Sequence, residues 1–241
     1  ENKGTISYWV SANIADAQNE LVEYLGKDVV KTGTIELLEG KPVNSIYGYK
    51  TAGIFQSDSE VDEHAFQNNK TGAGDVKYVD IDGNGRVDAG DQTFENPGDL
   101  QYLGNSGPRY TFGLQGGFNM KGFDFMVFFQ GVGKRVFLLD KELIQPFSRP
   151  WFGPQEHNMD YWTPENTDAS WPRLYTAGDH NFLPSDKWLQ NAAYVRLKDI
   201  QIGYTIPEQL VSRLAITKLR FYIAGHDVWE ATKAFDFIDP E

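Results

Sequence analysis

The feature that most constrains this chain is an alternation of apolar and polar residues with a period of two. From residue 110 to 120 one face carries Tyr110, Phe112, Leu114, Phe118 and Met120, and the other carries Thr111, Gly113, Gln115, Gly117 and Asn119. After Lys121 and Gly122 the apolar row resumes with Phe123, Phe125, Val127 and Phe129. Successive side chains of a strand point to opposite faces, so the pattern predicts two antiparallel strands joined by a tight turn.

The same alternation predicts further strands at residues 5–15, 199–206 and 218–223. A short helical turn is expected within residues 208–217, after Pro207. Two long stretches differ in composition. Residues 56–105 are acidic and rich in Gly, Asn and Asp, and residues 147–186 are rich in Pro, Trp and Asn. Both are predicted to be long polar loops, which in a compact domain are normally functional.

The predicted fold class is all-β. Strands of about ten residues, with tight turns on one side and long loops on the other, are typical of an antiparallel segment of a large transmembrane β-barrel with long extracellular loops. The alternative is a soluble β-sandwich, whose strands also alternate. We expect the following residues to face lipid: Phe112, Leu114, Phe118, Phe125, Val127 and Phe129. We expect Gln115, Asn119 and Gln130 to face the lumen.

Composition excludes several classes of function. Lys and Arg number 22 against 34 Asp and Glu, a net charge of −12, so nucleic acid and anionic lipid are not expected as main partners. A hydrophobic content of 40% excludes intrinsic disorder. Cysteine is absent, which excludes disulfides and thiolate chemistry. There is no apolar run long enough for a transmembrane helix. No signal peptide begins at Glu1, and both ends are expected to be cut from a longer chain.

Residues 80–91 carry the one motif with specific chemistry. They fill the calcium-ligand positions of an EF-hand loop, in order Asp80, Asp82, Asn84, the backbone carbonyl of Arg86, Asp88 and Asp91, with Gly85 at the required sharp bend. Asp91 stands where the pattern has Glu, and residues 75–79 before the loop read as a strand. The motif predicts a weak structural calcium site outside the EF-hand fold. The alternative is a hairpin turn held by Asx hydrogen bonds without a metal.

No catalytic constellation stands out, so an enzyme is not expected. The four histidines form no i, i+4 pair, and no glycine motif has the spacing of a phosphate loop or a nucleophile elbow. Four loop aromatics are candidates for binding cargo by stacking: Trp151, Tyr161, Trp162 and Trp171. They could instead form an interfacial girdle, or pack a long loop on itself.

Thirteen short stretches together resemble, in chain order, the C-terminal part of a SusC/RagA-type TonB-dependent outer-membrane transporter. They are residues 39–42 (EGKP), 47–49 (YGY), 53–57 (GIFQS), 74–78 (GDVKY), 110–113 (YTFG), 121–124 (KGFD), 128–131 (FFQG), 161–166 (YWTPEN), 172–173 (PR), 188–189 (WL), 194–198 (YVRLK), 203–207 (GYTIP) and 239–241 (DPE). Residues 94–102 resemble an insertion, and Asp227 stands where the family usually has Asn.

The resemblance implies that residues 1–241 are part of a barrel of about 22 strands with a plugged lumen. The plug, the segment that contacts TonB and the last strand would lie outside this sequence. It further implies a nutrient importer of the Gram-negative outer membrane, with extracellular loops, that takes up oligosaccharide or peptide with a SusD-like surface lipoprotein as partner. The residues alone leave an alternative open, a soluble secreted β domain that is stabilised by calcium and binds glycans. A glycoside hydrolase domain is a weaker third possibility.

Overall fold

The computed structural model describes residues 6–26, 30 and 35–241, so the predictions at Glu1 and Thr5 lie outside the described residues. The chain divides into two compact units. The sheet unit comprises residues 1–18, 108–135 and 191–241, and the loop unit comprises residues 19–107 and 136–190. Among the described residues, no helix is both long and apolar enough to cross a membrane.

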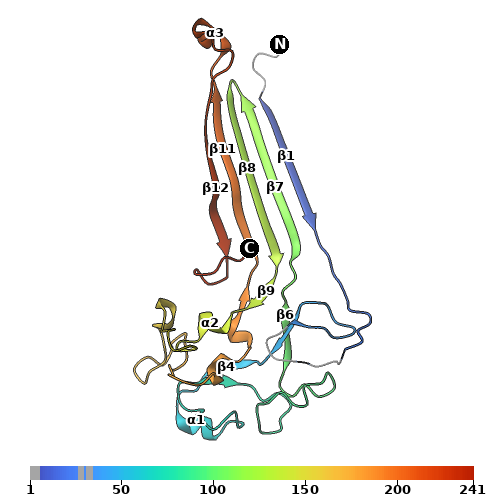
Figure 1. Ribbon diagram of the computed structural model, residues 1–241, viewed down its shortest axis with the longest axis vertical. Coiled ribbons are helices and arrows are strands. Elements are labelled where there is room, and N and C mark those ends of the chain that lie inside the picture. The colour runs from blue at the N-terminus through green and yellow to red at the C-terminus, as the bar shows by residue number, and fades with distance from the viewer. Residues whose placement is uncertain (1–5, 27–29, 31–34) are drawn as a thin grey trace. The chain divides into compact units, whose positions relative to one another are not determined.

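The sheet unit is built on one antiparallel five-stranded sheet (Figure 1). Its strands, in spatial order, are β1 (Ser7–Ala15), β7 (Arg109–Met120), β8 (Phe123–Lys134), β11 (Tyr194–Thr205) and β12 (Arg220–Thr232). The predicted hairpin is β7–β8, and its turn residues Lys121 and Gly122 both have positive φ, +49° and +89°, as a two-residue type I′ turn requires. The predicted helical turn is α3 (Glu208–Val211) followed by the 3-10 turn η4 (Ser212–Leu214).

The strand register places the apolar rows of all five strands on one face. Phe118 of β7 pairs with Tyr8 of β1 and with Phe125 of β8. Phe125 pairs in turn with Ile202 of β11, which pairs with Ile223 of β12. Residues directly opposite on neighbouring strands share a face, so these five side chains lie abreast. The register therefore confirms that the predicted apolar rows share one face. On the edge strands this face is exposed to solvent: Tyr8 is 79% exposed and Ile223 is 82% exposed.

The opposite face is mainly polar, although Met126 and Phe128 also lie on it, and glycines there make room for larger neighbours. A Cβ on Gly117 would lie 2.9 Å from the indole nitrogen of Trp9, and one on Gly113 would lie 2.6 Å from the amide oxygen of Asn13. The ionic pairs between strands also lie on this face, as in Arg220 with Asp124. Polar residues of β7 such as Gln115 thus share a face with charged residues of β11 and β12, as the alternation predicts.

A β-bulge interrupts β11 and β12 where the period of two breaks down. The register shifts between Leu197 and Asp199, so Lys198 on β11 stands opposite Asp227 and Val228 on β12. Asp227 has a φ of +50°, consistent with a bulged strand. The bulge keeps Leu197 on the apolar face although the alternation from Ile200 places it on the other. The predicted strands at 199–206 and 218–223 are for this reason too short.

The connections follow the predicted layout of short turns and long loops. Because β1, β7 and β8 run antiparallel, residues 16–108 between β1 and β7 and residues 135–193 between β8 and β11 leave the sheet at the same end. The short connections, at Lys121–Gly122 and residues 206–219, lie at the other end. Within the described residues the sheet is open, with β1 and β12 as its edges.

The loop unit contains small sheets and short helices. Its strands are β2 (Ile35–Glu36), β3 (Ser45–Gly48) and β6 (Gln101–Asn105) in one sheet, β4 (Thr51–Ile54) paired with β5 (Val76–Tyr78), and β9 (Val136–Leu138) paired with β10 (Leu189–Asn191). Its helices are α1 (Asp58–Asp62) and α2 (Lys141–Ile144), with 3-10 turns η1 (Glu156–Asn158), η2 (His180–Phe182) and η3 (Asp186–Trp188).

The segments predicted as long polar loops are in fact part of this folded unit with its own core. The buried cluster consists of Val30, Leu38, Tyr47, Tyr49, Val76, Tyr78 and Leu100. The rings of Tyr49 and Tyr78 lie 5.6 Å apart, centroid to centroid. Asp75 links separate segments of this unit. Its fully buried carboxylate accepts hydrogen bonds from Asn181, at 2.8 Å, and from the hydroxyl of Tyr175, at 3.0 Å. Apart from the pairs Tyr47/Tyr49 and Val76/Tyr78, the core residues are isolated in the sequence, so periodicity does not reveal this core as a whole.

Candidate metal centre

The acidic loop in the loop unit folds around the side chain of Asp80. Its two carboxylate oxygens accept hydrogen bonds from the backbone N–H groups of Gly83, at 2.8 Å, and Gly85, at 2.9 Å. Both glycines have positive φ, +73° and +82°, a conformation that side-chain-bearing residues rarely adopt. The sharp bend predicted at Gly85 is therefore present, and it wraps the backbone around one carboxylate.

The residues that follow make a series of Asx turns. Asp82 accepts from the backbone N–H of Asn84, at 3.0 Å, and Asn84 accepts from that of Arg86, at 2.8 Å. Asp88 accepts from the backbone N–H of Gly90 at 2.8 Å. These are the hydrogen bonds expected of the metal-free alternative. They leave further lone pairs on the same oxygens, because a carboxylate oxygen accepts more than one bond.

Asp99 joins this loop from outside the predicted motif. Its fully buried carboxylate accepts from the backbone N–H groups of Ile81, at 2.5 Å, and Asp88, at 2.9 Å. Carboxylate oxygens of Asp80, Asp82 and Asp99 lie within 4.8 Å of one another, and in the described part of the chain no other three acidic, His or Cys residues do so. Asp99 lies in residues 94–102, which resemble an insertion, and no spacing rule within residues 80–91 points to an aspartate eight residues further on.

The negative charges of the acidic loop affect the ionisation of a tyrosine in the neighbouring core. Burial, followed by the charges of Asp99 and Asp88, raises the pKa of Tyr49 to about 12. A buried tyrosine beside carboxylates ionises reluctantly because its anion would be both desolvated and repelled. A hard cation held by the cluster would offset that charge, and oxygen-only donors are the ligands that calcium prefers. The residues present therefore fit a calcium ion.

Of the predicted carboxylate ligands, Asp88 and Asp91 lie outside the group of three carboxylates. Asp91 accepts a hydrogen bond from the side-chain amide of Asn96 at 2.8 Å and closes a separate turn. The guanidinium of Arg86 lies over the ring of Phe66, 5.0 Å from its centroid. Of the predicted carboxylates, the structure thus brings together Asp80 and Asp82, and it adds Asp99.

The four loop aromatics divide by exposure. Trp162 and Trp171 are each only 5% exposed, so the prediction that these two rings stack on cargo is wrong. The indole N–H of Trp162 donates to Gln56 at 3.1 Å, and Trp171 packs on Trp188 with ring centroids 5.0 Å apart. They pack the loop on itself, which was the alternative. Tyr161 is half-buried, and Trp151, 76% exposed, presents its ring to solvent.

Comparisons with known proteins find similar proteins by sequence and by fold. No protein-family model matches the chain. "TonB-dependent receptor P3" of Formosa agariphila is 28% identical over 85% of the chain and 19% of its own length. "TonB-dependent receptor P39" of the same organism is 21% identical over 98% of the chain and 25% of its own length. The chain thus spans about a fifth to a quarter of these relatives.

Solved structures show the same fold. A structure of the RagAB peptide transporter matches with a TM-score of 0.71 and 19% identity, covering 100% of this chain and 25% of that chain. The RagAB peptide importer in the "open-open" state matches with a TM-score of 0.68 and 19% identity, covering 100% of this chain and 24% of that chain. Over nearly all of its length, this chain is similar in sequence and fold to part of a SusC/RagA-type TonB-dependent receptor, as its motifs indicated.

Proposed function

We propose that the chain forms part of the wall of an outer-membrane, TonB-dependent nutrient importer. The observation that carries this proposal is the continuous apolar face of the five-stranded sheet, bare on strands β1 and β12. Apolar surface of that extent is a liability in water and the requirement for contact with lipid. The polar opposite face, with its ionic pairs, then lines the lumen. In this function the chain would make or break no covalent bond of the cargo.

The partners proposed are those of an importer of this type. TonB would act through parts of the receptor outside residues 1–241, and a SusD-like surface lipoprotein would meet the loop unit on the extracellular side. The cargo is oligosaccharide or peptide, and the likeness to a peptide transporter makes peptide the first to test. The soluble, glycan-binding alternative is disfavoured because it leaves the apolar face without a cover.

The test is uptake by the bacterium that encodes the chain. We expect deletion of the gene to abolish accumulation of one class of labelled cargo, short peptides or oligosaccharides, and the wild-type gene to restore it. Deletion of TonB should have the same effect, and the protein should fractionate with outer membranes. Undiminished uptake of both classes, with the protein recovered in the soluble fraction, would overturn the proposal.

We also propose that the acidic loop holds a structural calcium ion. The carboxylates of Asp80, Asp82 and Asp99 would supply the primary ligands. Asn84, Asp88, Asp91 and the carbonyl of Arg86 complete the candidate set that the motif indicates. Bound calcium would offset the mutual repulsion of the carboxylates and order the loop. With an incomplete EF-hand pattern in an extracellular setting, we expect a dissociation constant of about 10⁻⁴ M.

Limited proteolysis and calorimetry of the intact protein test this site. Calcium should protect residues 75–93 from cleavage, and Asp82→Asn should remove that protection. Glu95→Gln is the matched control, because it removes an exposed acidic charge from the same loop but not from the carboxylate cluster. Absence of heat on titration with millimolar calcium, together with unchanged cleavage, would leave the Asx-turn alternative as the account of this loop.

A further inference from the structure

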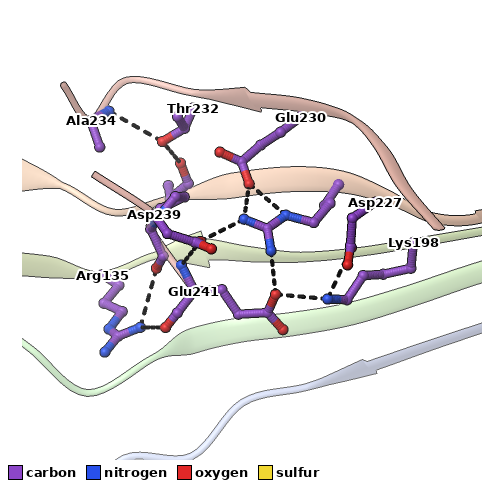
Figure 2. Close-up of polar contacts among 11 residues, drawn as sticks. Arg135, Lys198, Asp227, Glu230, Thr232, Ala234, Asp239 and Glu241 are labelled. Atoms are coloured by element: carbon purple, nitrogen blue, oxygen red, sulfur yellow. Dashed lines mark hydrogen bonds and ion pairs between the residues drawn. The ribbon is translucent and has the colours of Figure 1, made fainter. Parts of the chain in front are cut away.

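The segment that follows β12 folds back onto the sheet unit. Residues 233–241, which we call the strap, turn at Phe235, whose carbonyl accepts from the backbone N–H of Ile238 at 2.9 Å. At the start of the strap, Thr232 donates its hydroxyl to the carbonyl of Ala193 at 3.1 Å and accepts from the backbone N–H of Ala234 at 3.1 Å (Figure 2). Pro240, near its end, is fully buried. The strap is therefore anchored by its buried residues Ala234 and Pro240, whereas residues 235–237 between them are exposed.

Arg196 of β11 holds the strap with separate guanidinium nitrogens. Its Nη2 donates to Asp239 and its Nη1 donates to Glu241, each at 2.5 Å. Its Nε donates to Glu230 of the neighbouring strand β12, also at 2.5 Å. A planar guanidinium offers its N–H groups in a fixed fork, which suits several carboxylates at once. The side chain of Arg196 is only 11% exposed, since these three acids surround it.

Two further cations reach the same end of the strap. Lys198, the bulged residue of β11, lies 2.7 Å from Glu241 and 3.2 Å from Asp227 (Figure 2). Arg135, just after β8, donates from Nη1 to the carbonyl oxygens of Pro240 and Glu241, each at 3.3 Å. Side chains from β11 and from the end of β8 thus converge on residues 239–241.

The register assigns the strap to the polar face of the sheet. Arg196 pairs with Gln130 on β8 and with Glu230 on β12. The adjacent row, Leu197 with Phe129 and Trp229, belongs to the apolar face. The bulge allows Lys198 to accompany Arg196 on the polar side, where both meet the strap.

The two cations of β11 have carboxylate partners both with and without the strap. Without the strap, Arg196 keeps Glu230 and Lys198 keeps Asp227, so the cations of β11 retain carboxylate partners. With the strap in place, Asp239 and Glu241 add two negative charges, which Arg135, Arg196 and Lys198 hold together. Partly exposed ion pairs of this kind contribute little individually and weaken in salt.

We propose that residues 233–241 are a salt-held strap that closes over the polar face of β11 and opens without disturbing the sheet. The strap alternates between the closed state described above and an open state in which Asp239 and Glu241 are solvated. If the polar face lines a lumen, which rests on the proposed function, an open strap widens the passage beside Arg196 and Lys198. The ion pairs that hold the strap lie within the sheet unit, so the opening of the strap does not depend on a role in transport.

Hydrogen–deuterium exchange of the strap in the intact protein tests this. The double variant Asp239→Asn, Glu241→Gln alters only the strap and leaves both cross-strand pairs of β11 in place. We expect its strap amides to exchange at least about tenfold faster than those of the wild type. Wild-type exchange should rise between about 0.1 M and about 1 M salt, where the Debye length falls from about 10 Å to about 3 Å, and the variant should respond little.

Asp124→Asn is the control, because it breaks the ionic pair with Arg220 on the same face but touches no residue of the strap. It should leave strap exchange unchanged, and β11 and β12 should stay protected in all three proteins. Equal strap protection in wild type and double variant, or wild-type protection that ignores salt, would overturn the proposal. Because exchange is measured without cargo, this result is independent of whether the chain serves import.

Discussion

Single carboxylates organise the loop unit, and Asp160 shows how. Its side chain accepts from the amide of Asn166, at 3.0 Å, and from the backbone N–H of Ser170, at 2.9 Å. Trp171 follows directly and donates its backbone N–H to the carbonyl of Asp160 at 3.0 Å. Asp160 thus closes the loop that contains the buried residues Trp162 and Trp171. The hydrogen bond from Asn166, then that from Ser170, holds the pKa of Asp160 below its usual 3.8.

A depressed pKa gives this loop a defined response to acid. The stabilisation from ionised Asp160 is present above pH 3.8, the ordinary value, and is lost as the pH falls through the lower folded-state pKa. We expect Asp160→Asn to lower the thermal midpoint at neutral pH, and the difference from wild type to shrink below pH 3.8. Asp168→Asn, at an exposed position of the same loop, is the control. A difference that is constant with pH would contradict this role.

At the scale of elements, periodicity reveals strands only while it is unbroken. The β7–β8 hairpin was predictable because its two apolar rows and its Lys121–Gly122 turn agree with each other. The first part of β11 and the second part of β12 were not, because the bulge at Lys198 reverses the alternation. The acidic loop was found from its spacing, whereas Asp99 was missed because it approaches through tertiary folding.

The loop aromatics also show a limit of prediction from the sequence. Trp151 and Trp162 look alike in the sequence, since both lie in a stretch rich in Pro, Trp and Asn. The first is exposed and the second is buried, and only packing against residues far along the chain, such as Gln56, separates them. Composition therefore indicated that the loops matter but could not say which rings form the core.

The two faces of the β7–β8 hairpin yield a sharper prediction. Val127 lies in the apolar row, opposite Gly116 and Ile200, whereas Gln115 lies on the polar face opposite Phe128. If the apolar face contacts lipid, Val127→Arg should cost about 2–4 kcal/mol near the bilayer midplane. Gln115→Arg should assemble nearly as well as wild type. Folding into outer-membrane vesicles, followed by heat-modifiable electrophoresis, measures both, and equal assembly of the two variants would refute the assignment of faces.

At the scale of the whole molecule, the sheet unit is an open structure in need of neighbours. Within the described residues, β1 and β12 each pair on one side only, and their apolar residues are among the most exposed of the chain. Unpaired edges beside a bare apolar face promote association in water, and in lipid an open edge leaves backbone groups unsatisfied. The 241-residue chain expressed alone is therefore a poor candidate for a stable monomer.

Light scattering of that 241-residue chain in dilute buffer without detergent tests the point. We expect edge-paired oligomers or aggregates, because edge pairing satisfies the backbone and brings apolar faces together. Detergent should reduce the assembly by covering the apolar face. Charged edge variants offer the matched comparison: Val10→Lys on β1 and Ile223→Lys on β12 place a charge in the apolar row at each edge and should reduce association without detergent. A monodisperse monomer of the unaltered chain would instead support the soluble-domain alternative, since such a chain must have covered its apolar rows by itself.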